Sequence, residues 1–272
     1  MQFLVRAVYI IDHIDRITQE FGIVIKQIRV SVAGKLMIAG EWAVLVPKHP
    51  CIVCAIDRFV HATFYLSKKF KITSINNIKN LSFAESALDV VIQYLRENNF
   101  KIHAYAIALD SSEFEMILSD GTRSKLGFGS SAAVTVAVIS GILHVYGFDT
   151  ERSEVKDIIF KLACEAHFTA QGSEGSGFDI AASIYGGVLY YERFGKIEKI
   201  EIPDSWRLIV GFVGYSASTK NLVKHVKPVL FGDFGKRWAD DISTVVCDLR
   251  KAFEEDSFAE ARTALMNNRR LL

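Results

Sequence analysis

The sequence has 272 residues, half of them hydrophobic and only 4 of them proline, so it can bury a large core and is not expected to be disordered. Its 32 basic and 31 acidic residues give a net charge of +1, which provides no electrostatic reason to expect a nucleic acid as a partner. The apolar runs are shorter than the ~20 residues that span a bilayer, and no secretory signal pattern is seen. We therefore expect a cytoplasmic protein without a membrane partner.

The first third of the chain predicts strands. Residues 1–28 mix apolar and charged residues and fit either a packed helix or an extension that precedes the domain. β-Branched alternation over 26–32 predicts a strand, a second short strand is expected over 34–41, and an apolar run predicts further strand over 51–66. Cys51 and Cys54 in that run form an isolated C-x-x-C. Without a second pair of ligands, two small residues in an apolar strand are favoured over a redox or metal site.

The rest of the chain mixes helices and strands. Apolar residues at helical spacing predict a helix over 82–98, whose first turn carries Ser82 and Glu85 as a capping box. Further helices are expected over 131–146, from Asp149 or Thr150 to Gln171, and over 178–185, 221–230 and 234–253; strands are expected over 102–109, 187–192 and 206–213. Helices and strands do not alternate strictly, which favours an α+β fold.

A glycine- and serine-rich loop precedes the helix expected over 131–146. Residues 125–134 read K-L-G-F-G-S-S-A-A-V. Glycines allow a ligand to approach the main chain, and the N-terminus of a helix offers unpaired N–H groups to an anion such as a nucleotide phosphate. The spacing fits neither a Walker A loop nor the dinucleotide fingerprint. The alternative is an ordinary turn in which a serine caps the helix.

Two further polar segments complete a hypothesis of phosphoryl transfer. Such a reaction needs a cradle for phosphates, a cation that neutralises developing charge, and a group that orients or deprotonates the acceptor. Lys35 lies between glycines in an apolar segment and is the candidate cation; the alternative is a solvated surface lysine. Asp179, in the loop 172–179, is the candidate base. Its alternative role is structural, with Ser176 as the N-cap and Asp179 in a capping-box-like turn.

Five segments in the same order resemble the GHMP kinase superfamily, and most of all its phosphomevalonate kinase branch. Residues 33–44 resemble the first motif of the family, P-G-K-L-x-[IL]-A-G-E-Y-A-V, and 55–59 resemble the strand that follows it. Residues 125–134 resemble its phosphate loop, K-Y-G-L-G-S-S-A-A-V. Residues 171–187 resemble Q-G-x-G-S-G-F-D-x-A-A-S-x-Y-G-G, and 216–220 resemble S-x-A-S-T-K.

The resemblance implies a two-lobed fold and a set of site residues. ATP and Mg²⁺ are the implied cofactors, and phosphomevalonate is the implied small-molecule substrate. Asp179 and Lys35 would be the catalytic residues, and Ser130 would also lie at the metal. The nucleotide would be held by Lys125, Gly127, Gly129, Ser130, Ser131 and Ala132, and the acceptor by Ser176, Gly177, Ser218, Thr219 and Lys220. Family members that carry a metal-binding glutamate have it near the position of His167, for which a packed helix histidine is the simpler interpretation.

The same resemblance suggests three regions: an N-terminal extension over 1–28, the ATP-binding domain over 29–200, and an incomplete C-terminal domain over 201–272. The C-terminal part is expected to be truncated, because no late glycine-rich motif like that of the family follows. We expect apolar surface to remain exposed there and to promote self-association. The alternatives to phosphomevalonate kinase activity are a sibling kinase that acts on mevalonate or another small alcohol, and a degenerate homologue that binds a nucleotide without turnover.

Overall fold

The long strands β2 (Ile23–Ala39) and β3 (Pro50–Ser67) form the centre of a mixed sheet. The computed structural model describes residues 9–18, 23–76, 81–172, 175–214, 226, 228, 230 and 232–272. Within these residues seven strands form the sheet, in the order β1-β2-β3-β5-β4, with β8 paired to β3 and to β9. The other strands are β1 (Tyr9–Thr18), β4 (Lys71–Ser74), β5 (Ala104–Asp110), β8 (Val188–Glu192) and β9 (Ile197–Ile200).

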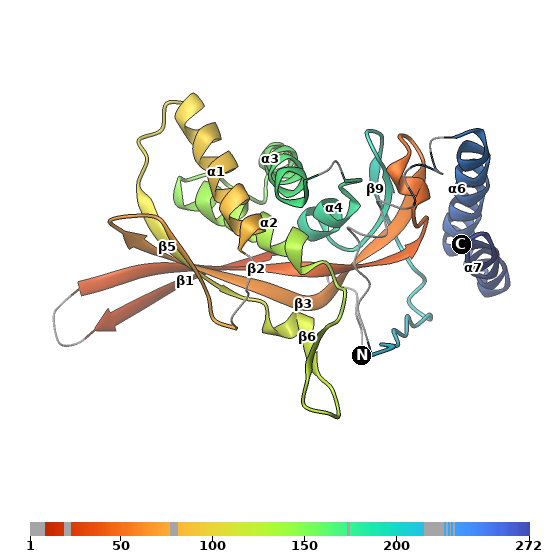
Figure 1. Ribbon diagram of the computed structural model, residues 1–272, viewed down its shortest axis with the longest axis horizontal. Coiled ribbons are helices and arrows are strands. Elements are labelled where there is room, and N and C mark those ends of the chain that lie inside the picture. The colour runs from red at the N-terminus through yellow and green to blue at the C-terminus, as the bar shows by residue number, and fades with distance from the viewer. Residues whose placement is uncertain are drawn as a thin grey trace.

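Four helices cover one face of the sheet (Figure 1). They are α1 (Ser82–Glu97), α2 (Ser130–Val145), α3 (Ser153–Gln171) and α4 (Phe178–Tyr185). The main core cluster lies between these helices, the first half of β2 and the antiparallel second half of β3. The central helix α2 is apolar almost all round, as a helix enclosed by other elements must be.

The second half of β2 and the first half of β3, which pair with each other, are covered on the other face as well. There α6 (Asp233–Glu254) and α7 (Phe258–Leu271) pack at the end of the molecule that carries the C-terminus (Figure 1). Asn268 of α7 joins this layer to the β2 end, because its side-chain amide donates to Glu41 Oε2 at 2.9 Å. Short 3₁₀ turns at Ala43–Leu45 and Ser112–Phe114 and a hairpin of β6 (Glu115–Ile117) and β7 (Arg123–Lys125) complete the described elements.

The side chains of β2 change faces part-way along the strand. Val30 and Val32 point to the helices α1 to α4. The pairing with β3 is irregular between Ala33 and Gly34, and beyond it Lys35 and Met37 occupy the face of α4. The intervening residues, Leu36 and Ile38, pack toward α6 and α7. An irregularity of this kind re-aims the side chains that follow it, because a shift of one residue exchanges the two faces of a strand.

The α+β class and most predicted elements are confirmed, with several corrections. The two strands expected over 26–41 are one strand, β2, and residue 28, the expected boundary of an extension, lies inside it. Residues 9–18 form β1, so the helix considered for this part is wrong. Residues 206–213 have no strand, whereas β9 and α7 are elements that the pattern missed. The helix expected over 221–230 falls largely outside the described residues.

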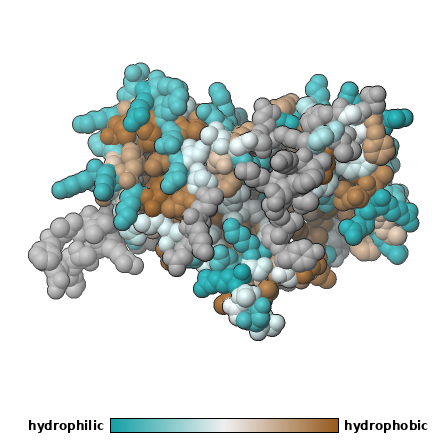
Figure 2. Space-filling model, in the orientation of Figure 1, coloured by the Kyte–Doolittle hydropathy of each residue, from teal (hydrophilic) through white to brown (hydrophobic). Residues whose placement is uncertain are grey.

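Hydrophobic residues reach the surface at the end formed by α6 and α7 (Figure 2). Leu265 and Met266 of α7 are 40% and 47% exposed, and Phe258 is 67% exposed. Among the described helices, none combines the length and the apolar character that crossing a bilayer requires.

Candidate functional site

The glycine loop forms the N-terminus of α2 in a shape suited to an anion. Gly127 and Gly129 have φ values of 79° and 75°, in the left-handed region that glycine favours. Gly129 is the N-cap of α2, and no side chain caps this helix end. The alternative of a serine cap is therefore wrong, because Ser130 and Ser131 lie inside the first turn. The first amide groups of α2 remain available to a ligand, and the helix dipole favours negative charge there.

Lys35 of β2 reaches across this loop. Its main-chain N–H donates to the Phe128 carbonyl at 2.9 Å, which fixes the loop beside the strand. Its side chain passes over Gly129, where an added Cβ would lie 2.9 Å from Lys35 Cε. The ammonium lies 5.4 Å from the centre of the Phe178 ring. Burial lowers the pKa of Lys35, and the charge of Asp179 opposes that effect. The alternative of a solvated surface lysine is wrong, since the side chain is half-buried in this cluster.

Asp179 lies in the first turn of α4. Gly177 is the N-cap of this helix, with φ 82°, and no side chain caps it. The proposed capping role of Ser176 is therefore wrong. Asp179 Oδ1 accepts a hydrogen bond from the Ile180 N–H at 3.0 Å, and the side chain is 20% exposed. The carboxylate thus has one oxygen held by the helix start and keeps a route to a ligand from solvent.

His167 of α3 connects the two helix starts. Its Nε2 atom lies 3.2 Å from Ser131 Oγ and 3.9 Å from Asp179 Oδ2. The ring is 4% exposed and packs against Phe83, with ring centres 4.8 Å apart. The sequence suggested only a packed histidine, and the structure adds the contacts to Ser131 and Asp179. The signal that could have indicated them is the position of His167 on the helix that leads directly into the loop of Asp179.

Two buried hydroxyl groups hold the main chain near the start of α4 and beside Lys35. Tyr191 of β8 donates to the Ser176 carbonyl at 2.6 Å, and burial raises the pKa of this phenol. Ser183 of α4 donates to the Ala33 carbonyl at 2.8 Å, which ties α4 to β2 two residues before Lys35. Neither residue was predicted from the sequence. Both bonds fix main-chain segments that carry site residues.

The structure brings only part of the predicted set together. Lys35, Gly129, Ser131 and Asp179 meet in one cluster, and Gly177 begins the helix that carries Asp179. Lys125 is exposed on β7 at the approach to the loop, whereas Ala132 is fully buried in α2 and can contribute only through its main chain. Ser218, Thr219 and Lys220 lie outside the described residues.

The residues at the start of α2 fit a metal ion that would be held mainly by a bound phosphate group. Among the described residues, no group of three or more His, Cys, Asp and Glu side chains is arranged to hold a metal ion. Mg²⁺ in nucleotide sites is commonly held through substrate phosphates and few protein ligands. The Ser130 hydroxyl, in the first turn of α2 beside unpaired amides, fits such a role.

Cys51 and Cys54 are free, buried thiols in β3, as the apolar-strand interpretation predicted.

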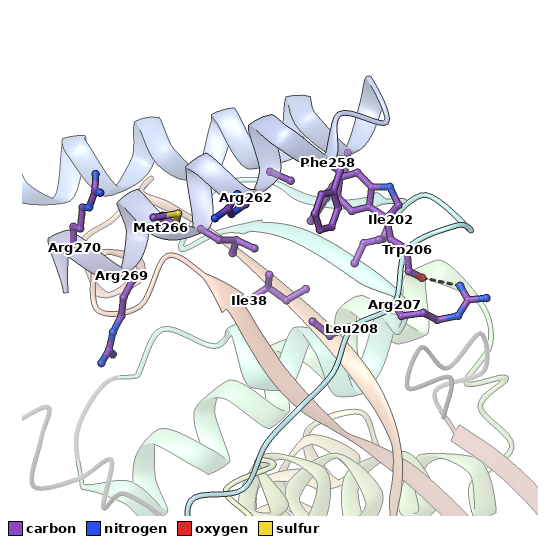
Figure 3. Close-up of a pocket in the computed structure, with 13 residues that line it drawn as sticks. Ile38, Ile202, Trp206, Arg207, Leu208, Phe258, Arg262, Met266, Arg269 and Arg270 are labelled. Atoms are coloured by element: carbon purple, nitrogen blue, oxygen red, sulfur yellow. Dashed lines mark hydrogen bonds between the residues drawn. The ribbon is translucent and has the colours of Figure 1, made fainter.

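An apolar groove of about 520 Å³ lies elsewhere, between α7, the segment 202–208 and Ile38 of β2. Phe258 and Trp206 stand at one end of it, and Arg269 and Arg270 stand at the other (Figure 3). No residue of α2 or α4 lines this groove. It is therefore separate from the cluster around Lys35.

Comparison with known proteins identifies relatives that are all kinases of one kind. Residues 83–187 match the model of the GHMP kinases N terminal domain. The mevalonate kinase of Pyrococcus horikoshii is 31% identical over 219 residues, which are 75% of this chain and 62% of that protein. The phosphomevalonate kinase of Streptomyces sp. (strain CL190) is 28% identical over 247 residues, covering 70% of this chain and 62% of that protein. The chain thus spans about 60% of the length of these curated relatives.

Solved structures agree with this on the level of the fold. The structure of the Lin0012 protein from Listeria innocua superposes with a TM-score of 0.79 at 24% identity. The superposition includes 90% of this chain and 78% of the Lin0012 chain. The Streptococcus pneumoniae phosphomevalonate kinase in complex with phosphomevalonate and AMPPNP has a TM-score of 0.72 at 19% identity, with coverage of 89% and 79%.

Proposed function

Because the chain belongs to the GHMP kinases, we propose that it transfers the γ-phosphoryl group of ATP, with Mg²⁺, to (R)-5-phosphomevalonate and forms 5-diphosphomevalonate. The observation that carries this proposal is the meeting of three groups: the uncapped start of α2, the Lys35 ammonium above it, and the Asp179 carboxylate. Together these groups can hold phosphates, neutralise charge and orient an acceptor, which are the requirements of phosphoryl transfer.

Each residue would have a distinct part in the reaction. The amides of Ser130 and Ser131 and the dipole of α2 would bind the nucleotide phosphates. The metal would supply charge neutralisation on the phosphates, with the Ser130 hydroxyl as a ligand. Asp179 would orient the attacking phosphate oxygen of the acceptor or take its remaining proton. Lys35 would stabilise the negative charge of the transferring group, since a desolvated cation acts strongly at short range.

The acceptor side supports phosphomevalonate through the loop 171–187, which resembles the phosphomevalonate kinase signature, and through the segment 216–220. Mevalonate is the second candidate acceptor, because several archaeal mevalonate kinases are 30–31% identical to this chain. A homologue that binds ATP without turnover is the third. Purified chain assayed for ADP release with phosphomevalonate, mevalonate or no acceptor separates the three. ADP release only with mevalonate would overturn the substrate proposal.

Asp179→Asn tests the catalytic assignment. We expect turnover to fall by ~10²–10⁴, the usual contribution of a general base, with an unchanged melting temperature. Asp157→Asn is the matched control, because Asp157 is an exposed carboxylate on α3 whose described partner is the Tyr185 hydroxyl at 2.9 Å. If Asp179→Asn turns over as fast as the wild type, Asp179 has only a structural role at the start of α4.

A further inference from the structure

His167 is a buried polar side chain placed between the two halves of the proposed site. Its Nε2 atom faces Ser131 Oγ at 3.2 Å and Asp179 Oδ2 at 3.9 Å. The opposite ring nitrogen, Nδ1, is buried and has no hydrogen-bond partner within the described residues. The ring therefore has one polar edge toward the site and one edge enclosed by the protein.

This asymmetry favours one tautomer. A buried N–H without an acceptor is costly, and a proton on Nδ1 would be such a group. A proton on Nε2 instead faces the Ser131 oxygen and the Asp179 carboxylate, both of which accept hydrogen bonds. In this tautomer His167 donates to Ser131 Oγ. The hydroxyl proton of Ser131 then does not point back at the ring and can be donated to a ligand.

We propose that His167 is a positioning residue that directs the Ser131 hydroxyl proton toward a nucleotide phosphate. The proposal rests on the proposed phosphoryl transfer and adds a residue to its nucleotide side. His167 touches neither the phosphate nor the acceptor in this role; it acts through Ser131. At 3.9 Å, Asp179 Oδ2 lies beyond hydrogen-bonding distance of Nε2, so the hydrogen bond of His167 is made to Ser131 alone.

Two amide substitutions separate this role from packing. In His167→Gln the amide nitrogen reaches the position of Nε2, whereas in His167→Asn it stops near Nδ1. Both replacements are polar and uncharged, so they differ mainly in reach. We expect His167→Asn to weaken the binding of AMPPNP about three- to tenfold, the usual effect of losing one hydrogen bond, and His167→Gln to remain close to the wild type. The KM for the acceptor should change in neither variant.

A double-mutant cycle with Ser131→Ala identifies the partner. If His167 acts through Ser131, the Asn substitution should have little further effect on AMPPNP affinity in the Ser131→Ala background. His144→Gln is the control. His144 is a half-buried histidine in the last turn of α2, the helix that carries Ser131, and its substitution should leave the affinity for AMPPNP unchanged. Calorimetric titration gives the affinities, and thermal unfolding shows whether each variant is folded.

The outcomes distinguish the two proposals. Wild-type chain that binds no AMPPNP would overturn the proposed function and this inference together. Wild-type chain that binds AMPPNP while Asn and Gln variants bind equally well, or equally poorly, would overturn only the role of His167. Full additivity of His167→Asn and Ser131→Ala would also overturn it, because the histidine would then act by another route.

Discussion

Gly129 and Lys35 are matched to each other at the residue scale. Gly129 has φ 75° and lies under the Lys35 side chain. Gly129→Ala should weaken AMPPNP binding about tenfold, because a Cβ both strains a left-handed residue by ~1–2 kcal/mol and displaces the lysine. The measurement is calorimetric titration of the folded variant.

Gly121 offers a matched control for this substitution. It has φ 80° at the turn between β6 and β7, and an added Cβ would meet nothing within 4 Å. Gly121→Ala should therefore cost a similar ~1 kcal/mol of stability without changing nucleotide affinity. Equal affinities in both alanine variants would remove the phosphate-loop assignment.

The lowered pKa of Lys35 predicts that the free energy of unfolding depends on pH. Burial lowers its pKa in the folded chain below the ordinary value of 10.5. Between the pKa of Lys35 in the folded chain and its pKa in the unfolded chain, the unfolded chain binds more protons. The contribution of Lys35 to the free energy of unfolding therefore rises with pH. The melting temperature of the wild type relative to Lys35→Met should increase as the pH is raised from neutral toward 10.5.

Thermal unfolding across this pH range measures the difference. The exposed Lys161 on α3 supplies the control variant, Lys161→Met. A difference in melting temperature between wild type and Lys35→Met that stays flat or decreases with pH would contradict a pKa of Lys35 lowered by burial.

Sequence patterns could identify individual site residues but not their contacts. The glycine loop, Lys35 and Asp179 were recognised because each stands in a motif with a chemical meaning. The link from His167 to Ser131 was not, because the two residues are 36 positions apart and meet only through the packing of α3 on α2. The capping alternatives, for a serine of the glycine loop and for Ser176, failed for a local reason: left-handed glycines occupy both N-cap positions.

At the scale of elements, Ser183 fixes α4 to β2. Its hydroxyl donates to the Ala33 carbonyl inside the core, and it is fully buried. Ser183→Ala should reduce the free energy of unfolding by ~1–2 kcal/mol, because the carbonyl loses its donor in a dry environment. Since α4 carries Asp179, turnover should also fall while AMPPNP affinity is retained. Denaturant titration and the ADP-release assay measure the two effects.

Ser243→Ala is the comparison for Ser183→Ala. Ser243 also donates to a carbonyl, that of Ala239, but this bond lies within α6 and joins no second element. Its loss should be nearly neutral, because alanine has the higher helix propensity. If both substitutions reduce the free energy of unfolding equally, the hydrogen bond between α4 and β2 stabilises the chain no more than a bond within one helix does.

Element prediction failed where tertiary pairing decides. Residues 206–213 are rich in β-formers, yet the described part of the chain gives them no strand partner, and Ile209 is 88% exposed. The four residues of β9 are too short for a pattern and depend on β8 for their hydrogen bonds. The start of α7 could have been recognised, because Ser257 precedes it and Glu260 follows three residues later, as in a capping box.

At the scale of the whole molecule, the reactivity of the four cysteines shows whether the sheet and its helices are packed as described. Cys51 and Cys54 are buried in β3 and Cys164 is half-buried in α3, whereas Cys247 is exposed on α6. Burial raises the pKa of Cys54 to about 11 and that of Cys164 to about 12. Because the thiolate is the reactive form, these three should resist labelling in the folded chain.

We therefore expect one thiol to react rapidly with a maleimide near pH 7.5–8, and all 4 after unfolding in guanidinium. Mass spectrometry of the labelled peptides should assign the first site to Cys247. The variant Cys247→Ser should abolish the rapid phase. Rapid labelling of Cys51 or Cys54 in the native chain would mean that β3 is open in solution.

The change of faces in β2 makes the length of the chain between Val32 and Lys35 as important as its residues. Deletion or insertion of one residue there would turn Lys35 away from α4 and toward α6, although every site side chain remained encoded. A library of single-residue insertions should thus lose nucleotide turnover sharply in this stretch. The same library should tolerate additions around Gly121, where the β6–β7 turn is exposed and no packed face depends on the count.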